Sequence, residues 1–213
     1  MNLPTYITLV RICSIPLLIW VLTSSRFTST NGQRELLACA VFLAASLTDA
    51  LDGFLARRRS QVTTLGMLLD PVADKLLIAA AFVTLVEFNP AVVPAWMVVI
   101  IVGREFLVSG LRSIAASEGF TIQASDLGKL KMFVQILCVL AAILDHHWAY
   151  LFGVPMYPLA LSLIWLMVAL ALWSAADYFF AFWKQIDQAS ERRRRKRSFV
   201  LSRRRKRNDV PAI

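Results

Sequence analysis

Several features that would assign this chain to a soluble class are absent from its 213 residues. We find no internal repeat, no glycine-rich phosphate-binding loop and no segment typical of a soluble domain. The three cysteines, Cys13, Cys39 and Cys138, lie in apolar segments at spacings that fit neither a disulfide framework nor a zinc site. The opening residues 1–6 lack the basic stretch of a signal peptide, so we expect the first apolar segment to be retained.

What the chain has instead is apolar sequence, with 58% hydrophobic residues and a mean hydropathy of +0.61. This balance is typical of a membrane protein. Apolar stretches near the length of ~20 residues that a spanning helix needs occur at about 7–22, 36–51, 65–86, 91–117, 130–145 and 156–183. The sequence therefore predicts an all-α, multi-pass membrane protein with six transmembrane helices.

The net charge of +9 is confined to the end of the chain. Residues 1–183 hold 11 basic and 11 acidic side chains, whereas residues 184–213 hold 12 basic and 3 acidic ones. We predict a membrane domain over 1–183 and a polybasic, disordered tail over 184–213. Basic runs are also typical of nucleic-acid binding, but a position beside the membrane suits anionic lipid headgroups, so we expect no nucleic-acid partner.

Basic residues also predict the orientation. Residues 57–59, Lys129, Lys131 and the tail all fall on one side if the chain starts in the cytoplasm. Since cytoplasmic loops carry the lysine and arginine excess, we predict that both termini are cytoplasmic.

Four aspartates interrupt the apolar sequence within 26 residues. Asp49 and Asp52 are three residues apart, and Asp70 and Asp74 are four apart, so each pair shares one helix face. A charge at the bilayer centre costs roughly 2.5–3.5 kcal/mol, which makes these acids functional candidates. If the two helices form a hairpin, four carboxylates meet and repel unless cations neutralise them. Hard oxygen ligands favour Mg²⁺, Mn²⁺ or Ca²⁺.

Small residues accompany the acids. Gly53, Ala56 and Gly66 leave space on the acidic faces, and Arg57 is suited to hold a phosphate. Together these residues indicate a diphosphate substrate held by two metal ions, with one acid available to take a proton from an attacking alcohol. The alternatives are ion pairs with arginines, a cation transporter, and a membrane prenyl diphosphate transferase.

The pattern Asp49-x₂-Asp52-Gly53-x₂-Ala56-Arg57-x₈-Gly66-x₃-Asp70-x₃-Asp74 resembles the signature of the CDP-alcohol phosphatidyltransferases. The resemblance implies a homodimer with a cytoplasm-facing site, in a bacterial inner membrane, that binds Mg²⁺ or Mn²⁺. It implies that Asp49, Asp52 and Asp70 bind metal and that Asp74 is both ligand and general base. The implied contacts to the CDP-linked donor are Asp52, Gly53, Ala56, Arg57, Thr63, Gly66 and Thr8.

Further segments resemble the phosphatidylglycerophosphate synthase branch of that family. They are residues 3–11, 69–75, 103–105 with Arg112, and 128–131 with Gln135, although Thr5 and Met132 depart from the branch. The branch implies CDP-diacylglycerol as donor and glycerol 3-phosphate as acceptor. Phosphatidylglycerol and an inositol phosphate remain alternative acceptors.

The acceptor phosphate requires cations separate from the metals. We expect these to be the basic residues of the fourth and fifth apolar segments, Arg104, Arg112, Lys129 and Lys131. Glu105 is expected to pair with a neighbouring arginine. His146 and His147, on a predicted exposed turn, are expected to be solvated.

Overall fold

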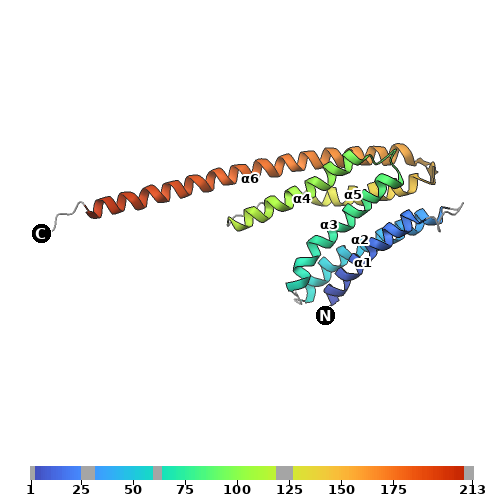
Figure 1. The fold of residues 1–213 in the computed structure, drawn as a ribbon, viewed down its shortest axis with the longest axis horizontal. Coiled ribbons are helices and arrows are strands. Elements are labelled where there is room, and N and C mark those ends of the chain that lie inside the picture. The colour runs from blue at the N-terminus through green and yellow to red at the C-terminus, as the bar shows by residue number, and fades with distance from the viewer. Residues whose placement is uncertain (1–2, 25–31, 60–63, 119–126, 209–213) are drawn as a thin grey trace. The chain divides into compact units, whose positions relative to one another are not determined.

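Six helices and one short β-hairpin are the regular elements of the described part of the chain (Figure 1). The computed structural model describes residues 3–24, 32–59, 64–118 and 127–208, and among these it describes the side chains of 8–24, 32–48, 72–73, 75–118 and 130–186. The elements are α1 (Leu3–Thr23), α2 (Gln33–Arg59), α3 (Thr64–Phe88), α4 (Ala95–Ser117), α5 (Leu127–Asp145), β1 (Tyr150–Leu151), β2 (Val154–Pro155) and α6 (Met156–Asn208). The predicted all-α class is confirmed.

The chain divides into two compact units. Unit 1 comprises Met1–Glu105 and Ser125–Leu172, and unit 2 comprises Phe106–Ala124 and Trp173–Ile213. Helices α4 and α6 each contribute to both units. The predicted division at residue 183 into a membrane domain and a tail stays a prediction.

Unit 1 contains one apolar core to which all six helices contribute. In it α1 packs against α2 and α3, and α5 packs against the same two helices. One fully buried side chain from each helix illustrates the core: Leu18, Phe42, Phe82, Ile101, Ile143 and Ile164. Cys39 and Cys138 are buried as small apolar residues, as expected, whereas Cys13 is exposed.

A two-residue hairpin joins α5 to α6, and the sequence analysis did not predict it. Strands β1 and β2 are antiparallel, with Leu151 opposite Val154. The two turn residues both have positive φ, 51° at Phe152 and 79° at Gly153. Positive φ at both central positions is the type I′ geometry, whose twist matches that of the flanking strands.

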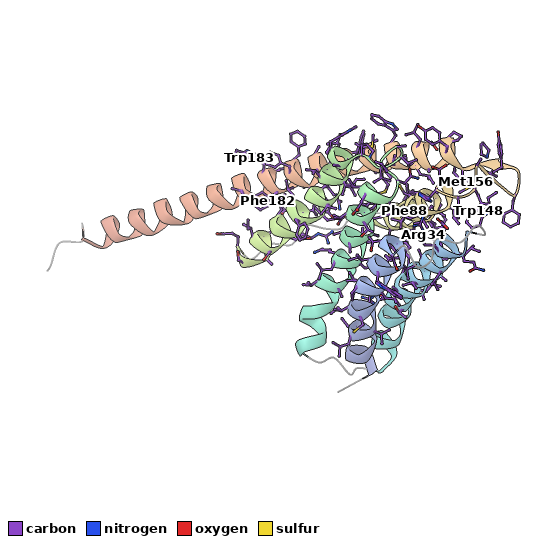
Figure 2. The ribbon with its side chains drawn as sticks, turned by 45° about the vertical axis from the view of Figure 1, so that its right-hand side comes forward. Arg34, Phe88, Trp148, Met156, Phe182 and Trp183 are labelled. Atoms are coloured by element: carbon purple, nitrogen blue, oxygen red, sulfur yellow. The ribbon has the colours of Figure 1, made fainter. Side chains whose placement is uncertain are left out.

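A cluster of polar and aromatic side chains joins the start of α2, the end of α3 and the residue after α5. Arg34 Nη2 and His146 Nδ1 lie 3.2 Å and 3.1 Å from the same oxygen of buried Glu35. The ring of Phe88 stacks on His146 with centroids 4.2 Å apart, and the Arg34 guanidinium lies 4.8 Å from the Phe88 centroid; Figure 2 shows Arg34 and Phe88 at this end of unit 1. His146 is exposed, as expected for a solvated turn, and its Nδ1 also lies within hydrogen-bond distance of the Glu35 carboxylate.

Helix α6 continues through Asn208, into the segment for which the sequence analysis predicted disorder. Arginine, lysine, glutamine and glutamate have good helix propensity. Extending an existing helix also avoids the unfavourable nucleation step that an isolated segment would face. The like charges of the tail therefore do not prevent helix formation next to a stable apolar helix.

By length and composition, one helical segment of the described residues can cross a membrane. It is Met156–Ile186 of α6, 31 residues long with a mean hydropathy of 2.2, while Thr8–Thr23 forms a shorter apolar helix. This criterion therefore identifies one of the six spans that the sequence predicts.

Candidate active site

The four aspartates lie on two successive helices of unit 1. Asp49 and Asp52 belong to the second half of α2, and Asp70 and Asp74 to the first half of α3. Because both segments are helical, the spacings of three and four residues place each pair on one helix face. The side chains of all four lie outside the described residues, so the structure describes their backbone positions only.

The predicted donor contacts surround these pairs in the sequence. Gly53, Ala56 and Arg57 follow on α2, and Gly66 lies in the first turn of α3. Their side-chain environment lies outside the described residues, as does Thr63 altogether.

Helix α1 adds polar groups to this region from its buried face. Thr8 is 1% exposed and Arg11, one turn later, is 0% exposed. Since α1 packs against α2 and α3, its buried face is the one turned toward those helices. Thr8 was predicted as a donor contact, and that role stays a prediction.

Arg11 is a buried charged residue to which the sequence analysis gave no role. The start of α1, the end of α2 and the start of α3 lie at the same end of unit 1 (Figure 1). Arg11 is eight residues from the start of α1, a rise of ~12 Å, while Asp49 and Asp74 are each ten residues from those helix ends, a rise of ~15 Å. The backbone of Arg11 therefore lies at about the same height along its helix as that of Asp49 and Asp74 along theirs. The available signal was a charge within an apolar segment, three residues after Thr8.

Two of the predicted acceptor cations meet at one carboxylate. Arg104 Nη1 donates hydrogen bonds to both oxygens of Glu105, at 3.2 Å and 3.3 Å. Lys131 of α5 forms an ion pair with the same carboxylate, at Oε1. The exposed fraction of the side chain is 10% for Arg104, 20% for Glu105 and 11% for Lys131. The expected pairing of Glu105 with a neighbouring arginine is confirmed, and Lys131 joins it.

Arg112 belongs to unit 2 and contacts a different partner. Its Nη2 donates a hydrogen bond to the hydroxyl of Tyr178 on α6, and its guanidinium lies 5.0 Å from the centroid of that ring. Tyr178 itself is 4% exposed. Arg104 and Arg112 share α4, but each makes its described contacts within its own unit. Lys129 lies in the first turn of α5, and its side chain is outside the described residues.

No group of three or more metal-ligating side chains occurs among those that the structure describes. The predicted ligands lie in the parts of α2 and α3 for which the structure describes the backbone but not the side chains. Their chemistry nonetheless fits divalent cations, since four carboxylates on two helix faces supply the hard oxygen donors that Mg²⁺ and Mn²⁺ prefer.

Comparisons with known proteins show the family to which the chain is similar. A sequence model of the CDP-alcohol phosphatidyltransferase family matches residues 1–175. The chain is 38% identical over 196 residues to the CDP-diacylglycerol–glycerol-3-phosphate 3-phosphatidyltransferase of Bacillus subtilis, covering 89% of this chain and 99% of the relative. It is 33% identical over 180 residues to the enzyme of the same name from Rickettsia bellii, covering 84% and 94%.

A solved structure supports the fold. The phosphatidylinositol phosphate synthase of Mycobacterium tuberculosis, crystallised with manganese and citrate, superposes with a TM-score of 0.58. The match covers 83% of this chain and 82% of that one at 20% sequence identity. At this identity the likeness extends to the fold and not to the acceptor.

Proposed function

The chain belongs to the CDP-alcohol phosphatidyltransferase family, and we propose that it transfers the phosphatidyl group of CDP-diacylglycerol to glycerol 3-phosphate, releasing CMP. The observation that carries this proposal is the match to the Bacillus subtilis relative, whose name states that reaction and whose length is covered almost completely. The product places the enzyme in phospholipid biosynthesis.

The aspartates supply the metal site in this proposal. Asp49, Asp52, Asp70 and Asp74 would hold two Mg²⁺ or Mn²⁺ ions, and the solved relative that contains manganese supports a divalent metal. Bound ions would neutralise charge on the donor diphosphate and on the departing CMP.

Asp74 is proposed as the general base. Its carboxylate takes the proton from a hydroxyl of the acceptor as that oxygen forms a bond to the phosphatidyl phosphorus. The bond between this phosphorus and the oxygen of CMP breaks, and CMP leaves with the bonding electron pair. Phosphorus therefore exchanges one P–O bond for another, with no redox change.

Donor and acceptor are held by different residues. Gly53, Ala56 and Gly66 leave room for the donor beside the acids, and Arg57 pairs with its diphosphate, with Thr8 and Thr63 as further contacts. The acceptor phosphate is bound by Arg104, Arg112, Lys129 and Lys131. Support for separate sites comes from the Arg104–Glu105–Lys131 group, which lies on α4 and α5 rather than on the helices of the aspartates.

The proposed setting is a bilayer. Large apolar side chains are exposed on several helices, including Val99 at 70%, Phe133 at 62% and Trp173 at 70%. Many exposed large apolar side chains on several helices suit contact with lipid or with a partner subunit. We therefore propose six spans in a bacterial inner membrane, a homodimer, both termini in the cytoplasm and the active site facing it.

The division at residue 183 is kept as a functional proposal. Residues 1–183 carry the reaction, and the basic residues beyond them contact anionic lipid headgroups at the cytoplasmic surface. At the approach to that segment, Trp183 is 58% exposed whereas Phe182 is 9% exposed (Figure 2), a pattern that suits an aromatic anchor at the membrane interface.

An acceptor screen tests the proposed function. Purified protein in detergent is incubated with CDP-diacylglycerol and Mg²⁺, and CMP release is measured with glycerol 3-phosphate, phosphatidylglycerol or inositol phosphate. CMP release with glycerol 3-phosphate as the preferred acceptor supports the proposal. Preference for either other alcohol would reassign the acceptor, and no CMP release with any alcohol would reject the transferase reaction.

A further inference from the structure

We propose that Glu105 is a positioning residue, which holds the Arg104 guanidinium and the Lys131 ammonium together as one binding unit for the phosphate of the acceptor. This inference rests on the proposed function and adds an anionic residue to a site that otherwise consists of cations. Glu105 itself does not touch the substrate in this account.

The contacts that carry the inference join two helices within unit 1. Arg104 and Glu105 are consecutive on α4, while Lys131 is on α5. Consecutive residues on a helix do not face each other, so the two hydrogen bonds from Arg104 Nη1 require the guanidinium to turn back toward its neighbour. The carboxylate therefore restricts the orientation of the guanidinium plane.

Burial explains why the carboxylate is needed. Lys131 is 9% exposed as a residue, and lysines are almost never buried without an ionic partner. Two cations close together in a region of low dielectric also repel each other. A carboxylate shared between them offsets that repulsion by attracting both cations, and the three side chains still sum to a charge of +1, which attracts a phosphate.

The same geometry suits recognition of a phosphate. A guanidinium carries five N–H donors in a rigid fork. Glu105 engages those on Nη1, so the fork has further donors with which to bind a phosphate. Bidentate binding of a phosphate depends on the orientation of that fork as well as on its charge. Glu105 thus reduces the local positive charge and improves the geometry, and these two effects have opposite consequences for acceptor binding.

The sign of the change in KM separates the two effects. Glu105→Gln keeps the shape of the side chain but removes its charge. If Glu105 only competes with the acceptor phosphate, this variant lowers the KM for glycerol 3-phosphate. If Glu105 positions the two cations, the KM rises by about tenfold, the scale of one hydrogen bond to a charged group, while kcat and the KM for CDP-diacylglycerol change less than about threefold.

The experiment compares five variants in detergent with the wild type: Glu105→Gln, three further single variants and one double variant. Glu105→Asp keeps the charge but shortens the side chain, so its acceptor KM is expected to lie between that of the wild type and that of Glu105→Gln. Glu87→Gln, at an exposed glutamate of α3, is the matched control and leaves all constants unchanged. In a Lys131→Met background, adding Glu105→Gln is expected to raise the KM less than about threefold, because Glu105 acts partly through Lys131.

Inorganic phosphate provides a readout that does not depend on the identity of the acceptor alcohol. As a competitive inhibitor against the acceptor, its Ki is expected to rise in Glu105→Gln by the same factor as the KM. If the wild type does not use glycerol 3-phosphate, the proposed function fails, and phosphate inhibition with the acceptor that does support CMP release still tests Glu105.

A lowered or unchanged acceptor KM and phosphate Ki in Glu105→Gln would overturn the inference. So would a fall in kcat alone, or equal increases in both KM values, since a purely structural role predicts those outcomes. If Glu105→Gln does not fold, Glu105→Asp decides: a raised acceptor KM at unchanged kcat supports positioning, and an unchanged KM rejects it.

Discussion

His146 Nδ1 lies 3.1 Å from Glu35 Oε1, although the two residues are 111 positions apart in the sequence. Glu35 is 3% exposed, and Arg34 approaches the same oxygen. Close by, Asn89 donates hydrogen bonds to the backbone of Ala142 and to the side chain of Asp145. Side-chain contacts therefore connect the start of α2 with the ends of α3 and α5. This end of unit 1 is opposite to the one that carries the aspartates.

Removing the Glu35 carboxylate should destabilise unit 1. In Glu35→Ala, Arg34 and His146 lose a buried partner, and we expect a loss of about 2 kcal/mol, within the range for hydrogen bonds to charged groups. Thermal unfolding in detergent measures this loss. Glu87→Ala, at an exposed position of α3, should change stability by less than about 0.5 kcal/mol; equal effects at the two positions would show that the cluster contributes nothing.

Gly32 should not tolerate a side chain. It has a φ of 67°, and an added Cβ would lie 2.5 Å from two ring carbons of Trp148. Because strained backbone and steric overlap act together, we expect Gly32→Ala to cost more than about 1 kcal/mol.

Two other glycines separate the cost of backbone strain from the cost of steric overlap. Gly153 has positive φ but open space around its Cβ position, so Gly153→Ala should cost only the backbone term of about 1 kcal/mol. Gly110 lies in α4 with open space, and Gly110→Ala should stabilise the helix by up to about 1 kcal/mol. Thermal unfolding of the three variants measures their stabilities, which are expected to rise from Gly32→Ala through Gly153→Ala to Gly110→Ala. A Gly32→Ala variant as stable as Gly110→Ala would mean that Trp148 moves aside.

Chelation tests the metal site. If the aspartates bind divalent cations, EDTA should abolish CMP release and added Mg²⁺ or Mn²⁺ should restore it. Asp49→Asn and Asp70→Asn should raise the metal concentration needed for half-maximal rate and also lower the maximal rate, because each loses a charged oxygen ligand. Full activity in excess chelator would refute the metal-dependent mechanism.

Asp74→Asn tests the general base. The amide keeps nearly the same shape but cannot accept the hydroxyl proton, so kcat should fall by at least ~10²-fold, in the range that general-base catalysis contributes. Binding of CDP-diacylglycerol, measured without acceptor, should change less. Near wild-type kcat in this variant would place the base at another residue.

Arg112→Lys tests the second acceptor cation. Lysine keeps the charge but loses the planar fork and its contact with Tyr178. We expect a several-fold higher KM for glycerol 3-phosphate with little change in the KM for CDP-diacylglycerol. Tyr178→Phe, which keeps the ring and removes only the hydroxyl, should give a smaller effect in the same direction. A shift in the donor KM instead would move Arg112 to the donor site.

The sequence by itself determined the helical class, the order of the apolar segments and the two aspartate pairs. These features are local: apolar run length predicts helices, and a spacing of three or four residues places side chains on one face whatever surrounds the helix. The helices that carry Asp49, Asp52, Asp70 and Asp74 were therefore predictable, because each pair is contained within a single segment.

Tertiary structure decided the contacts between segments. Nothing in the local pattern relates Glu105 to Lys131, or Glu35 to His146, because each pair meets only when separate helices pack around the shared core. The continuation of α6 to Asn208 likewise depends on the stable helix before it and not on the charged residues alone. Spacing along the chain fixes which residues share a helix face, but only packing brings charges on different helices together, since the apolar core determines which faces meet.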